Sequence, residues 1–140
     1  MEELKVEATL EHLDQVVEFV ISALDGCSFR TKTQVELVIE EIFVNIASYA
    51  YGDKIGPVLV TLSLGGNPPV LDLTFTDEGI PFDPLAKPDP DISLEPEERG
   101  IGGLGIFLVK KNVDEISYEH KDGKNYLHIR KNLNVAEGGA

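Results

Sequence analysis

The chain has little cysteine, few basic residues and no long hydrophobic run, and each shortage excludes a class of protein. Cys27 is the single cysteine, so neither an internal disulfide nor a cysteine-based zinc site can form, which favours the reducing cytoplasm. No window approaches the roughly 18 apolar residues of a membrane span. The acidic start of the chain also lacks the basic segment and apolar run of a signal peptide. We therefore expect a soluble, cytoplasmic protein with no membrane partner.

Acidic residues outnumber basic ones by 25 to 12, which gives a formal net charge of -13. This charge opposes contact with phosphate backbones and anionic lipid, so we expect no direct nucleic-acid partner. The same charge keeps a cytosolic protein soluble, and it leaves a basic protein partner open. At 140 residues and 42% apolar composition, the chain fits one domain that buries about two thirds of its extended surface.

Hydrophobic periodicity predicts three helices and five strands. The helices are expected over residues 9–24, 31–51 and 104–112, and the strands over 6–8, 58–64, 70–76, 115–119 and 125–131. Leu104, Phe107, Leu108 and Lys111 are expected to mark the faces of the third helix. This order implies an α+β fold, a two-layer α/β sandwich with helices on one face of a mostly antiparallel mixed sheet. We predict one domain over residues 1–134 and a flexible tail over 135–140.

A loop rich in proline and acidic residues separates the third strand from the third helix, over residues 77–102. Connections in compact domains are usually about 4 to 6 residues long, so a loop of this length is more typical of a functional lid than of a plain connector. A passive insertion is the alternative interpretation. The pattern does not decide between the two.

Glu41 and Asn45 lie four residues apart in the second predicted helix, so both side chains project from one face. The amide oxygen of Asn45 is a hard ligand suited to magnesium, and Glu41 could orient or deprotonate an attacking hydroxyl. The alternative is a solvated polar face with a hydrogen bond between the two residues.

Two further motifs bear on ligand binding. Asp77 directly follows a predicted strand, where its carboxylate can accept a hydrogen bond from the amino group of adenine, and Gly79 lets a purine approach the backbone. A plain reverse turn is the alternative. The glycines at 100, 102, 103 and 105 open the third helix, where free amides and the helix dipole favour phosphate. A flexible hinge or close helix packing would also explain them.

Arg99 is the one basic residue beside these glycines, and its guanidinium could hold a terminal phosphate and stabilise charge during transfer. A surface ion pair with Glu97 or Glu98 is the alternative interpretation of this residue.

Taken together, the three motifs resemble the N box and the two glycine boxes of the GHKL ATPase superfamily, in particular its anti-sigma factor serine/threonine kinase branch. The resemblance spans about residues 4–133, and its specific stretches are 38–45, 77–84 and 102–109. It implies a histidine-kinase-like ATPase domain with the Bergerat fold. Two positions depart from the pattern: Tyr49 stands where relatives often have histidine, and Arg99 is farther from Gly103 than in the kinases.

The resemblance implies a role for each matched residue. Glu41 and Arg99 would be catalytic, and Asn45 would hold magnesium. The remaining nucleotide contacts would come from Asp77, Gly79, Gly102, Gly103, Leu104 and Gly105. The cofactors would be ATP and Mg²⁺. The partners would be a small anti-anti-sigma (STAS-type) protein as phosphoryl acceptor and a sigma factor, and the protein would form a homodimer.

Two functions of different classes follow from these observations. The first is an ATP-dependent serine/threonine protein kinase and anti-sigma regulatory factor, which phosphorylates its small partner and sequesters a regulator. The alternative is a nucleotide-gated protein-binding module without kinase activity. An acidic domain that has lost nucleotide binding is a third reading, and the sequence leaves all three open.

Overall fold

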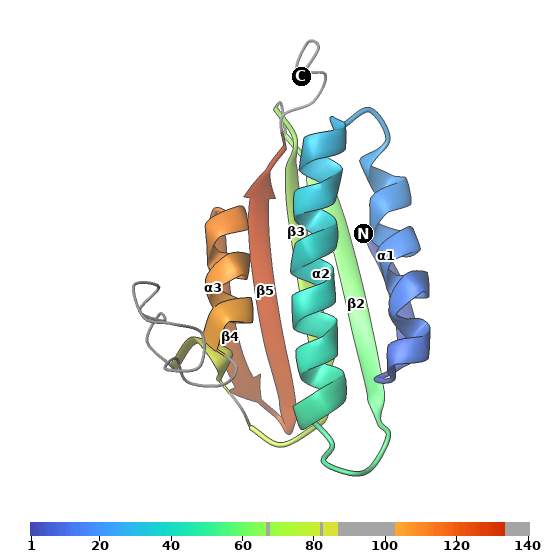
Figure 1. Cartoon of the computed structure of the whole chain (residues 1–140), viewed down its shortest axis with the longest axis vertical. Helices are drawn as coiled ribbons and strands as arrows, with labels where there is room; N and C mark the ends of the chain where they lie inside the picture. The colour runs from blue at the N-terminus through green and yellow to red at the C-terminus, as the bar shows by residue number, and fades with distance from the viewer. Residues whose placement is uncertain (67, 82, 87–102, 134–140) are drawn as a thin grey trace.

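An antiparallel sheet of five strands carries three α-helices on one face in the computed structural model, which describes residues 1–66, 68–81, 83–86 and 103–133 (Figure 1). The strands lie side by side in the order β1-β2-β3-β5-β4. Their bounds are β1 Glu2–Glu7, β2 Pro57–Gly65, β3 Val70–Asp77, β4 Glu115–Lys121 and β5 Lys124–Asn132. The helices are α1 Leu13–Ile21, α2 Phe29–Tyr49 and α3 Gly103–Asn112, with short 3-10 turns at η1 Leu10–His12, η2 Ser22–Leu24 and η3 Pro84–Ala86.

The predicted α+β sandwich with helices on one face is confirmed. All strand pairings among the described residues are antiparallel, so the mixed sheet of the prediction becomes a purely antiparallel one there. The predicted lid lies mostly outside the described residues, as does the tail over 135–140. None of the helices in the described part of the chain could span a membrane.

The core lies between α1 and α2 on one side and the inner face of the sheet on the other. Alternate residues of the central strands point into it, as expected for a half-buried sheet. The fully buried members include Val58, Val60, Leu71, Leu73, Phe75 and Ile129 from the strands and Val35, Val38, Ile39, Ile42 and Phe43 from α2. Because this packing fixes which side of α2 faces inward, it also fixes the direction of the polar residues next to Ile42.

The helix α2 begins at Phe29, two residues earlier than the sequence pattern predicts. The reason is Ser28, whose hydroxyl oxygen accepts a hydrogen bond from the Thr31 amide at 3.1 Å and so caps the first turn. The first predicted helix is divided into η1, α1 and η2. The hydroxyl of Thr9 does not cap a backbone amide there, because it bonds Nδ1 of His12 at 2.7 Å.

The residues that the sequence marks on the faces of α3 do not include the ones that are buried. Its buried side chains are Ile106 and Val109, whereas Phe107 is only partly buried and has the ammonium of Lys111 5.2 Å from its ring centroid. Every turn of this short helix offers an apolar residue on several sides, so periodicity alone does not select the buried one. At the C-terminal end of α3, Lys131 Nζ donates to the Asn112 carbonyl oxygen at 2.6 Å. Burial lowers the pKa of Lys131.

The β4–β5 hairpin forms as predicted, because Asp122 and Gly123 take the left-handed conformation with φ of 52° and 78°. We expect Gly123→Ala to lower the free energy of unfolding by about 1 kcal/mol, since no atom lies close enough to clash and only the backbone conformation opposes a Cβ. Urea unfolding measures the change. Gly65→Ala is the matched control, because Gly65 has free space and no positive φ. Equal stability of the two variants would contradict this interpretation.

Candidate functional site

The second half of α2 carries the polar residues singled out in the sequence along one side of the helix. Glu41 and Asn45 are partly buried and one turn apart, and Tyr49 follows one turn later. Ile42 and Ile46, each one residue farther along, are buried and turn toward the sheet. The helix therefore places a polar row beside an apolar wall.

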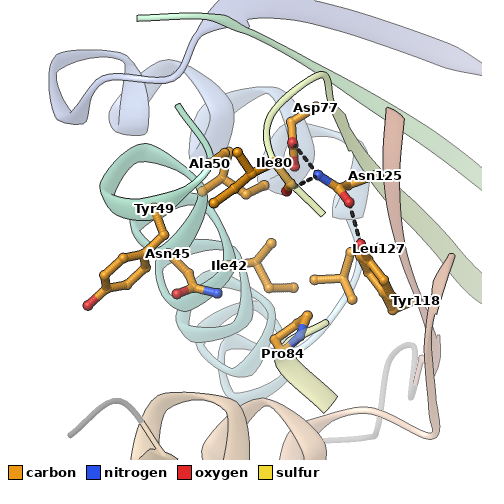
Figure 2. Close-up of a pocket in the computed structure, with 11 residues that line it drawn as sticks. Ile42, Asn45, Tyr49, Ala50, Asp77, Ile80, Pro84, Tyr118, Asn125 and Leu127 are labelled. Atoms are coloured by element: carbon orange, nitrogen blue, oxygen red, sulfur yellow. Dashed lines mark hydrogen bonds between the residues drawn. The ribbon is translucent and has the colours of Figure 1, made fainter. Parts of the chain in front are cut away.

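An apolar hollow lies between this end of α2 and the sheet and holds about 400 Å³ of empty space, including its open mouth (Figure 2). It is lined by Ile42, Asn45, Ile46, Tyr49, Ala50, Asp77, Ile80, Pro84, Tyr118, Asn125 and Leu127. Most of its wall is hydrocarbon, and its polar groups are few. This lining has the chemical character of a site for a flat, largely apolar ring with a polar edge.

Asp77 and Asn125 form the polar side of the hollow, and both are nearly buried, with 6% and 5% of their surface exposed. Asn125 Nδ2 donates to Asp77 Oδ1 at 2.9 Å and to the Ile80 carbonyl oxygen at 2.8 Å (Figure 2). On its other side, Asn125 Oδ1 accepts a hydrogen bond from the Tyr118 hydroxyl and lies 3.1 Å from His120 Nδ1. The asparagine side chain is therefore fully engaged, and it holds one oxygen of Asp77.

The turn after β3 fixes the same carboxylate from the other side. The Gly79 amide donates to Asp77 Oδ1 at 2.8 Å, and the Ile80 amide donates to the Ala50 carbonyl oxygen at 2.9 Å. A methyl group at Gly79 would lie 2.2 Å from that carbonyl oxygen, so the turn packs directly on the end of α2. The Gly79 amide and Asn125 Nδ2 both donate to Oδ1 of Asp77. Its Oδ2 therefore has no hydrogen bond among the described residues.

A second, more polar hollow adjoins the first and holds about 490 Å³ with its open mouth. It is lined by Glu41, Val44, Asn45, Ser48, Tyr49, Gly105 and Ile106. A methyl group at Gly105 would lie 2.3 Å from Glu41 Oε2, so the start of α3 lies directly against the Glu41 carboxylate. Asn45 and Tyr49 line both hollows, which makes the two spaces neighbours along α2.

The described residues thus bring Glu41, Asn45 and Gly105 to one hollow and Asp77 to the other. Gly79 lies in the turn beside Ala50, and Gly103 and Leu104 begin α3. Arg99 and Gly102 lie outside the residues that the structure describes.

Five residues of the apolar hollow have no role assigned from the sequence. Ile80 and Pro84 lie within the stretch 77–84, whereas Tyr118, Asn125 and Leu127 lie in no recognised motif. One signal for Asn125 was present. It shares the inward phase of β5 with Leu127 and Ile129, so alternation places a polar amide on the buried face. A buried amide needs hydrogen-bonding partners, and that need points to a polar cluster.

The residues around Asn45 suit magnesium only if other ligands complete the shell. Within residues 1–66, 68–81, 83–86 and 103–133, no group of three or more His, Cys, Asp and Glu side chains could hold a metal ion. Magnesium typically takes one or two protein oxygens and fills its octahedron with water and phosphate oxygens. The Asn45 amide oxygen could take that role if a nucleotide and water supplied the rest of the shell.

An antiparallel sheet with helices on one face and two neighbouring hollows beside α2 is the arrangement of a family of ATP-binding domains. The chain belongs to the family described as the histidine kinase-like ATPase domain, whose model matches residues 6–131. Membership of this family implies ATP binding. The resemblance to the anti-sigma factor kinase branch of the GHKL ATPases, seen in the sequence, is confirmed at the level of the family.

Named relatives agree with this assignment. The chain is 26% identical over 132 residues to "Serine-protein kinase RsbW" of Bacillus cereus, covering 89% of this chain and 81% of the relative. It is 27% identical over 109 residues to "Serine/threonine-protein kinase BtrW" of Bordetella bronchiseptica, covering 78% and 76%. Among solved structures, the RsbU and RsbW domains of Rv1364c from Mycobacterium tuberculosis match with a TM-score of 0.64 at 16% identity, over 95% of this chain and 33% of that one. This last match shows the fold alone.

Proposed function

We propose that this chain is an ATP-dependent serine/threonine protein kinase and anti-sigma regulatory factor, which phosphorylates a small anti-anti-sigma (STAS-type) protein and sequesters a sigma factor. The observation that carries the proposal is the pair of neighbouring hollows that share Asn45 and Tyr49. One is apolar with a single buried carboxylate, and the other is polar. A nucleotide has this division, because its base is flat and its phosphates are anionic.

In this proposal the adenine ring enters the apolar hollow, and Asp77 accepts its amino hydrogen through Oδ2. The protein donors already hold Oδ1, so the free oxygen is fixed in place before the base arrives. A preorganised acceptor of this kind favours adenine over bases with a carbonyl at the same position, since two acceptors repel.

The phosphates lie in the polar hollow beside Gly105, where the backbone at the start of α3 can approach them. Magnesium, held by Asn45, supplies neutralisation of phosphate charge when it is bound. Gly103 and Leu104 belong to the same helix start, and Arg99 and Gly102 are proposed to complete the phosphate contacts. Backbone amides and the Asn45 amide orient the terminal phosphoryl group toward the open side of the hollow.

Glu41 is the proposed catalytic base. Its carboxylate lies at the edge of the polar hollow, where it can accept the proton of a serine or threonine hydroxyl as that oxygen bonds to the γ-phosphorus. The bond between the γ-phosphorus and the bridging oxygen breaks, and ADP leaves. Catalysis of this kind depends mostly on positioning and electrostatics.

The relatives named as serine and serine/threonine kinases support the choice of a protein acceptor. We also propose that the chain acts in the cytoplasm as a homodimer, with residues 1–134 as its single ATPase domain.

Mass spectrometry tests the activity. The full chain is incubated with magnesium, ATP and a purified STAS-type protein from the same genome, and the partner's mass is compared with a sample lacking ATP. We expect one added phosphate, located on a serine or threonine. A partner that binds in a nucleotide-dependent way but gains no phosphate would contradict the kinase and support the nucleotide-gated binding module.

A further inference from the structure

The hydroxyl of Tyr51 bridges two strands at the turn that presents Asp77. It donates to the Pro57 carbonyl oxygen at 2.5 Å and accepts from the Glu78 amide at 2.7 Å. Burial raises the pKa of the Tyr51 phenol, although the Glu78 amide opposes that rise, so the hydroxyl keeps its proton at neutral pH. One side chain just beyond α2 thus contacts both β2 and the segment after β3.

The position of this bridge in the sheet gives it a specific effect. Val58 pairs with Asp77 at the end of the β2–β3 ladder, so the same register places Pro57 opposite Glu78. The Glu78 amide and the Pro57 carbonyl both bond the phenol, which stands where a direct bond between the strands would otherwise form. The hydroxyl therefore separates the two strands at the residue that follows Asp77.

The Tyr51 ring is held by its surroundings. A methyl group at Gly56 would lie 2.2 Å from the ring, so the residue before β2 must be glycine for the ring to keep this place. Ala50, the preceding residue, accepts the Ile80 amide and packs against Gly79. Ala50 and Tyr51 together fasten the turn to the end of α2, the helix that carries Asn45.

We propose that Tyr51 is a positioning residue for base recognition, which sets the place of the Asp77 carboxylate by separating β2 from Glu78. This inference rests on the proposed nucleotide site. It predicts that the phenol controls the preference for an adenine base, because the Asp77 oxygen reads only the amino group of that base. A nucleotide without this group has no such bond to lose.

The test compares the affinities of the full chain for ADP and for inosine diphosphate, which carries a carbonyl in place of the amino group, by calorimetry with magnesium. We expect the wild type to prefer ADP by about 100-fold, as for a site with a fixed acceptor. Without the bridge the strands close, and the carboxylate moves. Tyr51→Phe should lower the preference to about tenfold, roughly the loss of one hydrogen bond to a charged group.

Three further variants separate a positioning role of Tyr51 from an effect on stability alone. Gly56→Ala leaves the phenol in the chain but displaces its ring, so we expect the same loss of preference, whereas Gly65→Ala, made in open space, should keep it. Tyr126→Phe is the chemical control, since Tyr126 lies between two inward residues of β5 and faces the other side of the sheet. It should keep the wild-type preference.

The outcomes distinguish the inference from the function on which it rests. A wild type that prefers ADP, with Tyr51→Phe less stable but equally selective, would overturn the positioning role and leave the nucleotide site standing. An equal loss of preference in Tyr126→Phe would also overturn it. A wild type that binds neither nucleotide would overturn the proposed function and this inference together.

Discussion

Replacing Glu41 with glutamine is expected to lower the rate of phosphoryl transfer by about 100- to 10,000-fold, the typical cost of losing a general base. Glutamine keeps the shape of the side chain and its packing against Gly105 but cannot accept the proton of the attacking hydroxyl. Nucleotide affinity should therefore stay near that of the wild type. The measurement is single-turnover transfer from labelled ATP to the STAS-type partner, with nucleotide binding measured in parallel.

Glu36→Gln is the matched control for this variant. Glu36 is exposed on the same helix and lines neither hollow, so the same loss of charge there should leave transfer unchanged. If Glu41→Gln transferred phosphate at the wild-type rate, Glu41 would not be the base. If Glu41→Gln lost nucleotide binding as well, the Glu41 carboxylate would help to bind the nucleotide rather than accept a proton from the attacking hydroxyl.

The second large effect concerns Asp77. Asp77→Asn should weaken ADP binding by about 100-fold, because the amide places a donor where the amino group of adenine also donates. The fold should survive, since an asparagine oxygen can still accept from Gly79 and Asn125 at the position of Oδ1. The same donor can pair with a carbonyl, so the variant should prefer inosine diphosphate to ADP. Calorimetry with both nucleotides measures this reversal.

Asp72→Asn provides the comparison on the opposite face of β3. Hydrogen bonds from Arg130 and His128 lower the pKa of Asp72, although burial acts in the other direction and is the largest single influence. Its contacts are a surface ion pair with Arg130 at 3.0 Å and a hydrogen bond with His128 at 2.9 Å, and exposed contacts of this kind usually contribute less than about 1 kcal/mol. This variant should bind ADP as the wild type does. Wild-type affinity in Asp77→Asn would remove Asp77 from the base site.

The sequence predicted the parts of this site that depend on local geometry. Glu41 and Asn45 share one side of α2 because any helix places residues four apart together. Asp122 and Gly123 form a hairpin because that dipeptide favours the left-handed conformation. The fold class followed from the order of such elements, and it agrees with the described structure.

The remaining parts depend on contacts between distant segments. Asn125 meets Asp77 across 48 positions of sequence, and only the register of β3 against β5 brings them together. The role of Tyr51 depends on the register of β2 against β3 in the same way. The buried side chains of α3, Ile106 and Val109, were not identified from the sequence, because periodicity alone does not select them; Val109 belongs to the core cluster.

Thermal unfolding with and without magnesium and ADP tests the central claim, that the two hollows form one nucleotide site. Ligand at about 100 times its dissociation constant stabilises a native state by roughly 2.7 kcal/mol, which raises the unfolding midpoint by several degrees in a domain of this size. We expect such a rise with magnesium and ADP, and a smaller one when the metal is chelated. No rise at millimolar nucleotide with magnesium present would contradict it.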